Sequence, residues 1–297
     1  MKILISSNAS DLLSYNREEL KQSIKASEGR TILAENVATR PSYIGDITNA
    51  KLSRGFGADL ILLNGVDVLE PNLPSIENQE DFVNELKNLV GRPIGVNLVP
   101  VDTDADIMEE AESISRGRTV NEDSLKKIEE LGMDFVCFTG NHGTGVTNKE
   151  IVKAIQKARA NYSGLIIAGK MHSAGVDEPV YSQEAIVDFI KAGADIILIP
   201  SIGSVPGFDK DDLKTVVRIA HKKGALVMTA IGTSQEGARP DTIRQMAIEN
   251  TICGVDIQHI GDAGYSGLAP VENIFEMSVA IRGIRHTVSM VARSINR

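Results

Sequence analysis

The sequence is short of positive charge, and it has no long apolar run. Its 31 lysines and arginines against 40 aspartates and glutamates give a net charge of −9. Binding to a nucleic-acid backbone or an anionic membrane requires a basic surface, so neither partner is expected, although local donors can still hold a small anion. No apolar stretch reaches the ~20 residues of a membrane span. The apolar run in residues 1–6 is too short for a signal peptide, and we expect a cytoplasmic protein.

The chain also has little cysteine and no linker. Cys137 and Cys253 both lie inside apolar stretches, which is typical of small buried side chains in a reducing compartment rather than of reactive thiols. No segment rich in serine or proline divides the chain, so we predict one domain over residues 1–297.

One pattern recurs: a glycine, one further residue, an aspartate and then an apolar run. It stands at residues 57–64, 132–139, 193–200 and 254–261, with looser copies at 164–169 and 224–229. An apolar run without alternating polar residues is typical of a parallel strand that is buried on both faces.

Eight strand-then-helix units can be placed along the chain, most of them spaced by roughly 30 residues, as in a βα repeat. The strands are predicted at 31–35, 60–63, 93–99, 135–138, 165–169, 196–199, 226–231 and 257–260. Eight units match a (β/α)₈ barrel of about 250 residues with additions. The alternative, an open doubly wound sheet, usually has a glycine-rich fingerprint after its first strand, and residues 35–39 contain no glycine.

We therefore predict an α/β fold, a single (β/α)₈ TIM barrel with an N-terminal extra helix. The helix lies in a cap of residues 1–30, where Asn16 and Glu19 form a capping box. A charged loop at 102–120 is inserted after the third strand. The long final helix, 270–291, is predicted to pack on the barrel or on another subunit, so a homo-oligomer is an expectation.

Chemistry in such barrels lies at the carboxyl ends of the strands. Lys170 and His172 close the fifth strand, and Lys170 is a candidate Schiff-base nucleophile or anion anchor. His172, Glu35 and His142, also at strand ends, are candidate general acids or bases. The structural alternatives are a solvated lysine, a structural histidine and an ion pair between Glu35 and Lys170.

Glycines gather after the seventh and eighth strands, where barrel enzymes often bind phosphate through backbone N–H groups. Arg239 could add a charged fork, and asparagines at other strand ends could hydrogen-bond a substrate oxygen. The predicted ligand is a small anionic metabolite. The predicted substrate- and phosphate-binding residues are Asn64, Asn97, Asn141, Gly232, Thr233, Ser234, Arg239, His259, Asp262, Gly264, Ser266 and Gly267.

A metal centre of His142, His172, His259 and Glu35 can be conceived, but no tight ligand spacing supports it. No residue is assigned to a metal, and Mg²⁺ stays open as a cofactor. Residues 102–106 resemble the Asp-x-Asp-x-Thr nucleophile motif of haloacid-dehalogenase-type phosphatases, with Asp106 in the last place. An acidic solvated loop is the alternative.

Two further segments resemble a known superfamily. Asn97 stands where the phosphonomutase and isocitrate-lyase superfamily has an acidic Mg²⁺ ligand, and Lys170-Met171-His172-Ser173 echoes its Lys-x-Cys-Gly-His gating loop without the cysteine. Taken whole, the chain resembles an uncharacterised bacterial barrel family loosely labelled phosphoenolpyruvate phosphonomutase-like or haloacid-dehalogenase-like.

From these observations we expect a lyase or isomerase that acts on a small phosphorylated or carboxylated metabolite at the C-terminal face of the barrel. The alternatives are a Mg²⁺-dependent phosphatase that uses Asp102 and a non-catalytic barrel that binds a metabolite.

Overall fold

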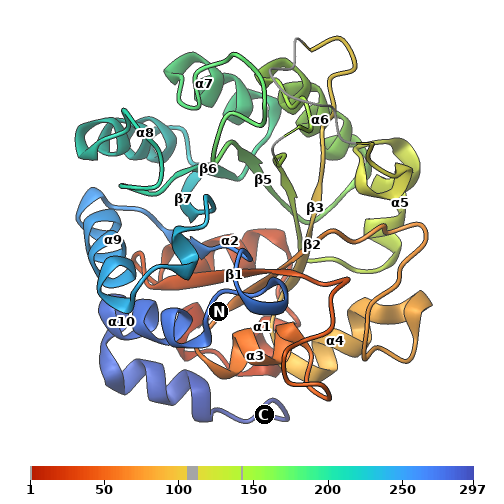
Figure 1. The fold of residues 1–297 in the computed structure, drawn as a ribbon, viewed down its shortest axis with the longest axis vertical. Helices are drawn as coiled ribbons and strands as arrows, with labels where there is room; N and C mark the ends of the chain where they lie inside the picture. The colour runs from red at the N-terminus through yellow and green to blue at the C-terminus, as the bar shows by residue number, and fades with distance from the viewer. Residues whose placement is uncertain (1, 106–112, 142) are drawn as a thin grey trace.

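The structure is a computed structural model that describes residues 2–105, 113–141 and 143–297. Within these residues eight parallel strands follow one another in chain order and close into a barrel, with the first strand paired to the last (Figure 1). The strands are β1 (Thr31–Val37), β2 (Leu60–Asn64), β3 (Ile94–Leu98), β4 (Phe135–Phe138), β5 (Leu165–Gly169), β6 (Ile196–Pro200), β7 (Leu226–Ile231) and β8 (Ile257–Ile260). The prediction of a single (β/α)₈ barrel is confirmed.

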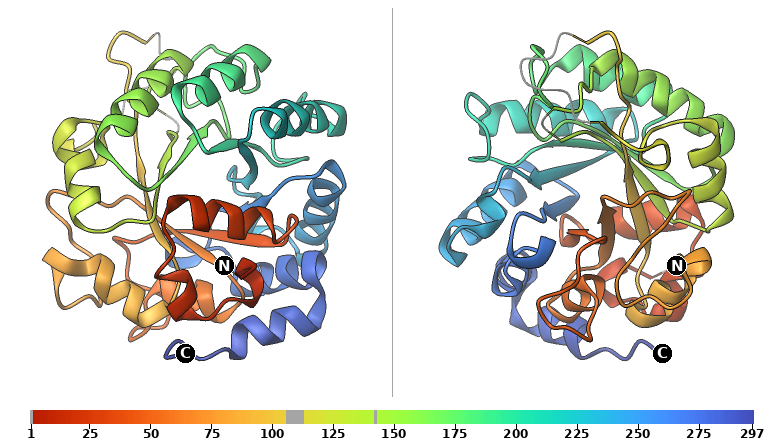
Figure 2. Two further views of the ribbon diagram at one scale, coloured as in Figure 1. Left: turned by 180° about the vertical axis from the view of Figure 1, so that it is seen from behind. Right: turned by 45° about the vertical axis from the view of Figure 1, so that its right-hand side comes forward.

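Helices surround the barrel as an outer ring (Figures 1 and 2). They are α3 (Asn49–Gly55), α4 (Phe82–Val90), α5 (Glu122–Glu130), α6 (Asn148–Asn161), α7 (Gln183–Ala192), α8 (Lys210–Lys222), α9 (Pro240–Cys253) and α10 (Val271–Ala292). The long helix α10 is kinked at Gly283, which has a left-handed φ of 72°. Among the described residues no helix combines the length and the apolar character needed to cross a membrane.

The N-terminal segment covers the end of the barrel at which the strands begin, where Lys21 contacts Asp195 just before β6. It contains the short helix α1 (Ala9–Leu12) and the extra helix α2 (Arg17–Lys25), which lies across the strands when the molecule is seen from behind (Figure 2, left). The predicted capping box of Asn16 and Glu19 begins α2. Leu4, Leu20 and Ile24 are buried in the same apolar cluster as side chains from the barrel interior. The burial of these residues attaches the segment to the barrel.

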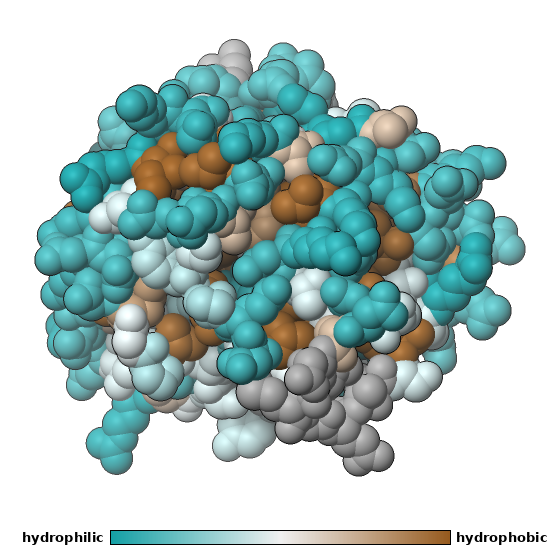
Figure 3. All heavy atoms as spheres, turned by 90° about the horizontal axis from the view of Figure 1, so that it is seen from above, coloured by the Kyte–Doolittle hydropathy of each residue, from teal (hydrophilic) through white to brown (hydrophobic). Residues whose placement is uncertain are grey.

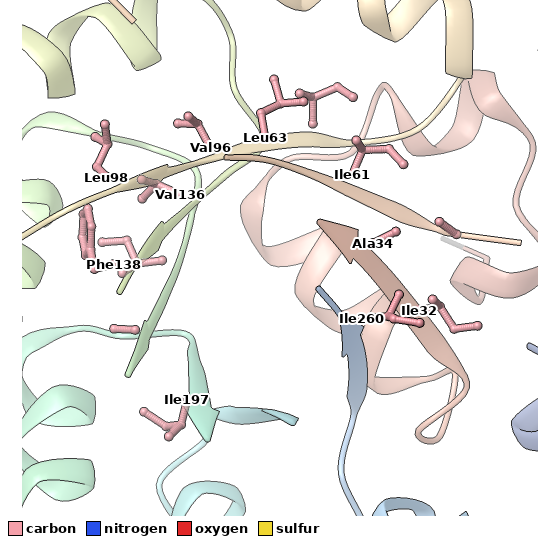
Figure 4. Close-up of a cluster of buried hydrophobic side chains, with 14 of the residues drawn as sticks. Ile32, Ala34, Ile61, Leu63, Val96, Leu98, Val136, Phe138, Ile197 and Ile260 are labelled. Atoms are coloured by element: carbon pink, nitrogen blue, oxygen red, sulfur yellow. The ribbon is translucent and has the colours of Figure 1, made fainter. Parts of the chain in front are cut away.

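The apolar side chains of most strands divide between two cores. Those that point outward, such as Ile61, Val96 and Ile197, pack between the strands and the helices (Figure 4). Those that point inward fill the barrel, where a β-carbon on Gly95 would lie 2.2 Å from the ring of Phe135. Burial on both faces explains why the strand sequences show no alternation of polar residues.

The recurring aspartate of the glycine-x-aspartate pattern ties neighbouring strands together at the N-terminal end of the barrel. Asp59, for example, donates its backbone N–H to the carbonyl of Ile32 and accepts the N–H of the same residue on its carboxylate, at 2.9 and 2.8 Å. The same two bonds join Asp134 to Ile94, Asp195 to Ile166, and Asp256 to Val227. The pattern therefore marks the starts of β2, β4, β6 and β8.

Each of these four aspartates also contacts a cationic or titratable side chain. The partners are Arg282 for Asp59, Lys87 for Asp134, Arg159 for Asp195 and His221 for Asp256. A carboxylate with both backbone and charged partners is stable in a buried position. The recurring spacing of the pattern thus has a structural role.

On the face shown in Figure 3 the surface is mostly hydrophilic, with hydrophobic residues in small areas between polar ones.

Cys137 and Cys253 are free and buried, as predicted. Burial raises the pKa of the Cys137 thiol well above its usual value, which makes it a poor nucleophile.

Candidate active site

Three inward-facing polar side chains lie together at the C-terminal end of the barrel. Glu35 comes from β1, Asn97 from β3 and His259 from β8, and all three are buried. His259 Nε2 lies 2.8 Å from Glu35 Oε2, and Asn97 Nδ2 donates to Glu35 Oε1. An ionised carboxylate only accepts, so with Glu35 ionised the proton of the histidine bond is on Nε2. Nδ1 of His259 has no partner among the described residues.

Strand β1 is longer than predicted, because it runs to Val37. Glu35 therefore lies inside the strand, not at its end. The reason is that Asn36 and Val37 still pair with Leu63 and Asn64 of β2. Glu35 consequently points into the barrel, below the rim.

Above this group a second acid lies at the rim. Asp262 follows β8, and its Oδ2 accepts a hydrogen bond of 2.8 Å from Asn64 Nδ2 at the end of β2. Burial and the negative charge of Glu35 raise the pKa of Asp262 from 3.8 to about 7. A carboxyl group with this pKa can accept and release a proton near neutral pH.

A third carboxyl group, Glu236, was not recognised in the sequence. It lies in the 3₁₀ helix η4 (Gln235–Gly237) after β7, is buried, and accepts the backbone N–H of Ala263 at 3.0 Å. Burial raises its pKa. The sequence signal that could have identified Glu236 is its position as an acid inside the glycine-rich loop after β7, since that loop neighbours the loop that holds Asp262.

The two glycine loops are shaped by packing within the protein. Gly232 lies against Met171, where a β-carbon would be 2.2 Å from the sulfur. The Thr233 hydroxyl donates to the Ser204 carbonyl at 2.8 Å. Ser234 has a left-handed φ of 75°, and Arg239 is exposed.

In the second loop, Gly264 donates its N–H to the Asp262 carbonyl, and Gly267 packs against Val37. The Ser266 carbonyl accepts from Asn49. The N–H of Ala263 is already engaged by Glu236. The phosphate site at these loops stays a prediction.

The ion-pair partner of Lys170 is Glu178, not Glu35. Its Nζ lies 2.6 Å from Glu178 Oε2, and the same oxygen accepts the N–H of Asn148 at 3.0 Å. Burial lowers the pKa of Lys170, and Glu178 opposes this change. The proposed ion pair between Glu35 and Lys170 is wrong, because Glu35 contacts His259 and Asn97 instead.

The remaining predicted residues lie near the fourth and fifth strand ends. His172 Nδ1 accepts the N–H of Ala174 at 3.1 Å. Asn141 is exposed, and its carbonyl accepts from the Thr144 hydroxyl. His142 lies outside the described residues.

A family model described as "Domain of unknown function (DUF7916)" matches residues 5–297. The chain belongs to the DUF7916 family. No curated protein matches it.

Solved structures with the same fold share few residues with this DUF7916 member. Dihydrodipicolinate synthase from Oceanobacillus iheyensis is 13% identical with a TM-score of 0.53, over 91% of this chain and 79% of that chain. Thiamine phosphate pyrophosphorylase from Pyrococcus furiosus is 14% identical with a TM-score of 0.50, and the match covers 86% of this chain and 97% of that chain. The third structure is 2,3-dimethylmalate lyase, a PEP mutase/isocitrate lyase superfamily member. It is 11% identical with a TM-score of 0.50, and the match covers 82% of this chain and 79% of that chain. Likeness at these identities shows the fold alone.

The comparisons bear on the predicted resemblance in two ways. The barrel layout expected from the phosphonomutase and isocitrate-lyase superfamily is supported by a member with the same fold. The haloacid-dehalogenase label receives no support from them. Asp102 lies on the loop after β3, where its carboxylate accepts from the Thr147 hydroxyl at 2.8 Å and from the Asp104 N–H at 3.0 Å. Asp106, the last residue of that motif, lies outside the described residues.

The described part of the DUF7916 chain contains no group of three or more histidine, cysteine, aspartate or glutamate side chains arranged to hold a metal ion. What the site does contain is three carboxyl groups and a histidine, which lie on the neighbouring strands β1 and β8 and on the segments that follow β7 and β8. Two of these carboxyl groups have raised pKa values.

Proposed function

We propose that the protein is a lyase that cleaves a bond next to a carbonyl group in a small carboxylated or phosphorylated metabolite. The observation that carries this proposal is Asp262, whose pKa of about 7 results from burial and from the charge of Glu35. Strongly shifted pKa values at a barrel's C-terminal end are typical of groups that transfer protons. Similar barrels include proteins named as a lyase and a synthase, which agrees with this class of reaction.

The chemistry requires one group that can both accept and return a proton. In a retro-aldol cleavage a base accepts the proton of the substrate hydroxyl, the C–C bond breaks, and its electron pair moves to the adjacent carbonyl as an enolate. The enolate then takes a proton at carbon. Asp262 can perform both transfers near neutral pH because both of its protonation states are populated there.

The neighbouring residues position this acid. Asn64 holds the Asp262 carboxyl by its hydrogen bond, and burial together with the charge of Glu35 keeps the pKa of Asp262 high. His259 and Asn97 in turn hold Glu35. An isomerase would instead use the same acid to accept the C–H proton next to the carbonyl and to return it at the neighbouring carbon of the enediolate, with no C–C bond broken, so the products distinguish the two classes.

The test is a panel of small hydroxy acids, keto acids and phosphate esters, incubated with the protein in D₂O and followed by NMR. Cleavage and deuterium incorporation at the carbon next to the carbonyl are expected for the substrate. Asp262→Asn should lower kcat about 10²- to 10⁴-fold, the usual contribution of a general acid or base. The matched control is Asp241→Asn, because Asp241 is an exposed residue on α9. Full turnover by Asp262→Asn would rule out this role, and saturable binding without turnover would favour a non-catalytic barrel.

Glu35→Gln tests the positioning role separately. Removing the charge of Glu35 should lower the pKa of Asp262, since that charge raises it. The acid limb of the pH profile of kcat should therefore move to lower pH. An unchanged profile would show that Glu35 does not act through Asp262.

The hypothesis that Lys170 holds the carbonyl covalently has its own test. A Schiff base is reduced by borohydride, and the adduct adds a fixed mass to the protein. Lys170→Ala should abolish both the adduct and turnover. Retained turnover would remove Lys170 from the mechanism and leave it as the partner of Glu178.

A further inference from the structure

A cavity lies outside the barrel wall, between strands β1 and β2 and helices α3 and α4. Its inner part is apolar and includes Leu63 and Leu86, while its polar part includes Asn36, Arg40 and Asn49. Successive residues of a strand point to opposite faces, so Asn36 faces away from the barrel interior that holds Glu35. The cavity is therefore separate from the proposed catalytic group.

Two polar atoms in the cavity wall are buried without a partner in the described part of the chain. They are Nδ2 of Asn36, a residue that is 1% exposed, and Oδ1 of Asn49, which is 4% exposed. The orientation of the Asn49 amide is determined by its Nδ2, which donates to the Ser266 carbonyl at 2.9 Å. Asn49 thus offers an acceptor to the cavity. Buried polar groups are nearly always hydrogen-bonded, so both atoms indicate a missing polar partner.

Arg40 supplies the charge at this site. Among the described residues that line the cavity it is the one charged side chain, and its guanidinium has no ion-pair partner in the described structure. The protein as a whole has a net charge of −9. An unpaired arginine with no lining carboxylate favours an anion, because guanidinium groups bind carboxylate and phosphate oxygens well.

We infer that this cavity binds a small oxyanion that also carries a hydroxyl group, such as a hydroxycarboxylate or monoprotonated phosphate. The anionic oxygens accept from Arg40 and Asn36, and the hydroxyl donates to Asn49 Oδ1. The apolar inner wall accommodates a short hydrocarbon part of the ligand. This binding does not depend on the proposed lyase reaction, since none of the proposed catalytic residues lines the cavity.

The experiment measures binding directly, by titrating the full chain with glycolate, acetate and inorganic phosphate in isothermal calorimetry and ¹⁵N NMR. Glycolate should bind saturably and about tenfold more tightly than acetate, the effect of one additional hydrogen bond in a buried site. Comparison of glycolate with phosphate identifies which oxyanion the site prefers. Arg40→Gln should weaken every anion by about tenfold or more, since a charge-assisted bond is lost.

Two variants of the cavity wall refine the assignment. Asn49→Ala should remove the preference for glycolate over acetate while acetate still binds. Asn36→Leu should weaken all three anions, provided that near-UV circular dichroism shows a folded chain. Arg40 is exposed, so Arg40→Gln tests the inference even if a substitution at a buried asparagine prevents folding.

Matched arginine controls distinguish this cavity from other places. Arg218→Gln, on the exposed side of α8, should leave the affinities unchanged. If Arg239→Gln weakens binding and Arg40→Gln does not, the anion site is at the glycine loops and the inference is wrong. Absence of saturable binding for all three probes would mean that the cavity holds water only, and would also overturn it.

Discussion

The acidic residues at the two ends of the barrel differ in their spacing and in their partners. At the N-terminal end, Asp59, Asp134, Asp195 and Asp256 are spaced around the ring, and each contacts its own arginine, lysine or histidine. At the C-terminal end Glu35, Asp262 and Glu236 lie close enough for their charges to interact, and the contacts of these acids are with amides, a backbone N–H and one histidine.

The difference agrees with the proposal that the N-terminal end is organised for stability and the C-terminal end for chemistry. Separated and paired carboxylates stabilise the folded chain, while a buried carboxyl group close to another acid has a raised pKa, as Asp262 does. Functional sites commonly contain such unfavourable arrangements, which the rest of the fold offsets. Three substitutions, taken from the largest expected effect to the smallest, test this comparison.

The largest effect is expected from Asp59→Asn at the N-terminal end. Asp59 and Arg282 are both fully buried and lie 2.7 Å apart. Asparagine can still accept from Ile32, but Arg282 is left as an unpaired buried charge, which costs about 3–5 kcal/mol. Urea unfolding measures the loss, with the exposed Asp241→Asn as control. A loss below about 1 kcal/mol would show that the pair is dispensable, contrary to the comparison.

An intermediate effect is expected from Asp262→Asn, which should reduce the loss of stability at rising pH, whereas Asp59→Asn lowers stability. The folded-state pKa of Asp262 is about 7, above its usual 3.8, so its stabilising contribution is complete below about pH 4 and is lost as pH rises through 7. Between pH 4 and 8 the free energy of unfolding should therefore fall less for the variant than for the unmodified protein. The two decreases should differ by at most about 4 kcal/mol. Parallel pH–stability curves for the two proteins would contradict this expectation.

The smallest effect is expected at His221. The hydrogen bond from His221 to Asp256 raises the pKa of the imidazole above its usual 6.5, against the effect of burial. Its contribution to stability is present below pH 6.5 and is lost as pH rises through the raised folded-state pKa. Because the side chain is 42% exposed, solvent screening limits the contribution to under about 1 kcal/mol. His221→Gln should abolish this pH dependence, and a larger change would mean that the pair is less screened than its exposure indicates.

Much of the fold could be predicted because its signals are local. The apolar runs at β2, β4 and β6 and the caps of helices such as α2 depend on neighbouring residues in the chain. The end of β1 was less accessible to prediction, since the strand continues through Asn36 and Val37 only because β2 offers partners there.

The candidate site could be predicted in part. The sequence indicates that Glu35, His259 and Asp262 lie near strand ends, and their contacts agree with a shared end of the barrel. It does not reveal that Glu178 is the partner of Lys170, or that Glu236 is buried against Ala263. Those contacts depend on loop conformations that no periodic pattern encodes.

By itself the sequence determined the number and type of repeating units, because strand and helix periods are properties of consecutive residues. Only the tertiary structure decided which charges meet. Arg282 reaches Asp59 across 223 positions, and His259 reaches Glu35 across 224, because closing the barrel brings the last elements against the first. The pKa of Asp262 follows from that closure, since burial and the nearby charge of Glu35 exist only in the folded ring.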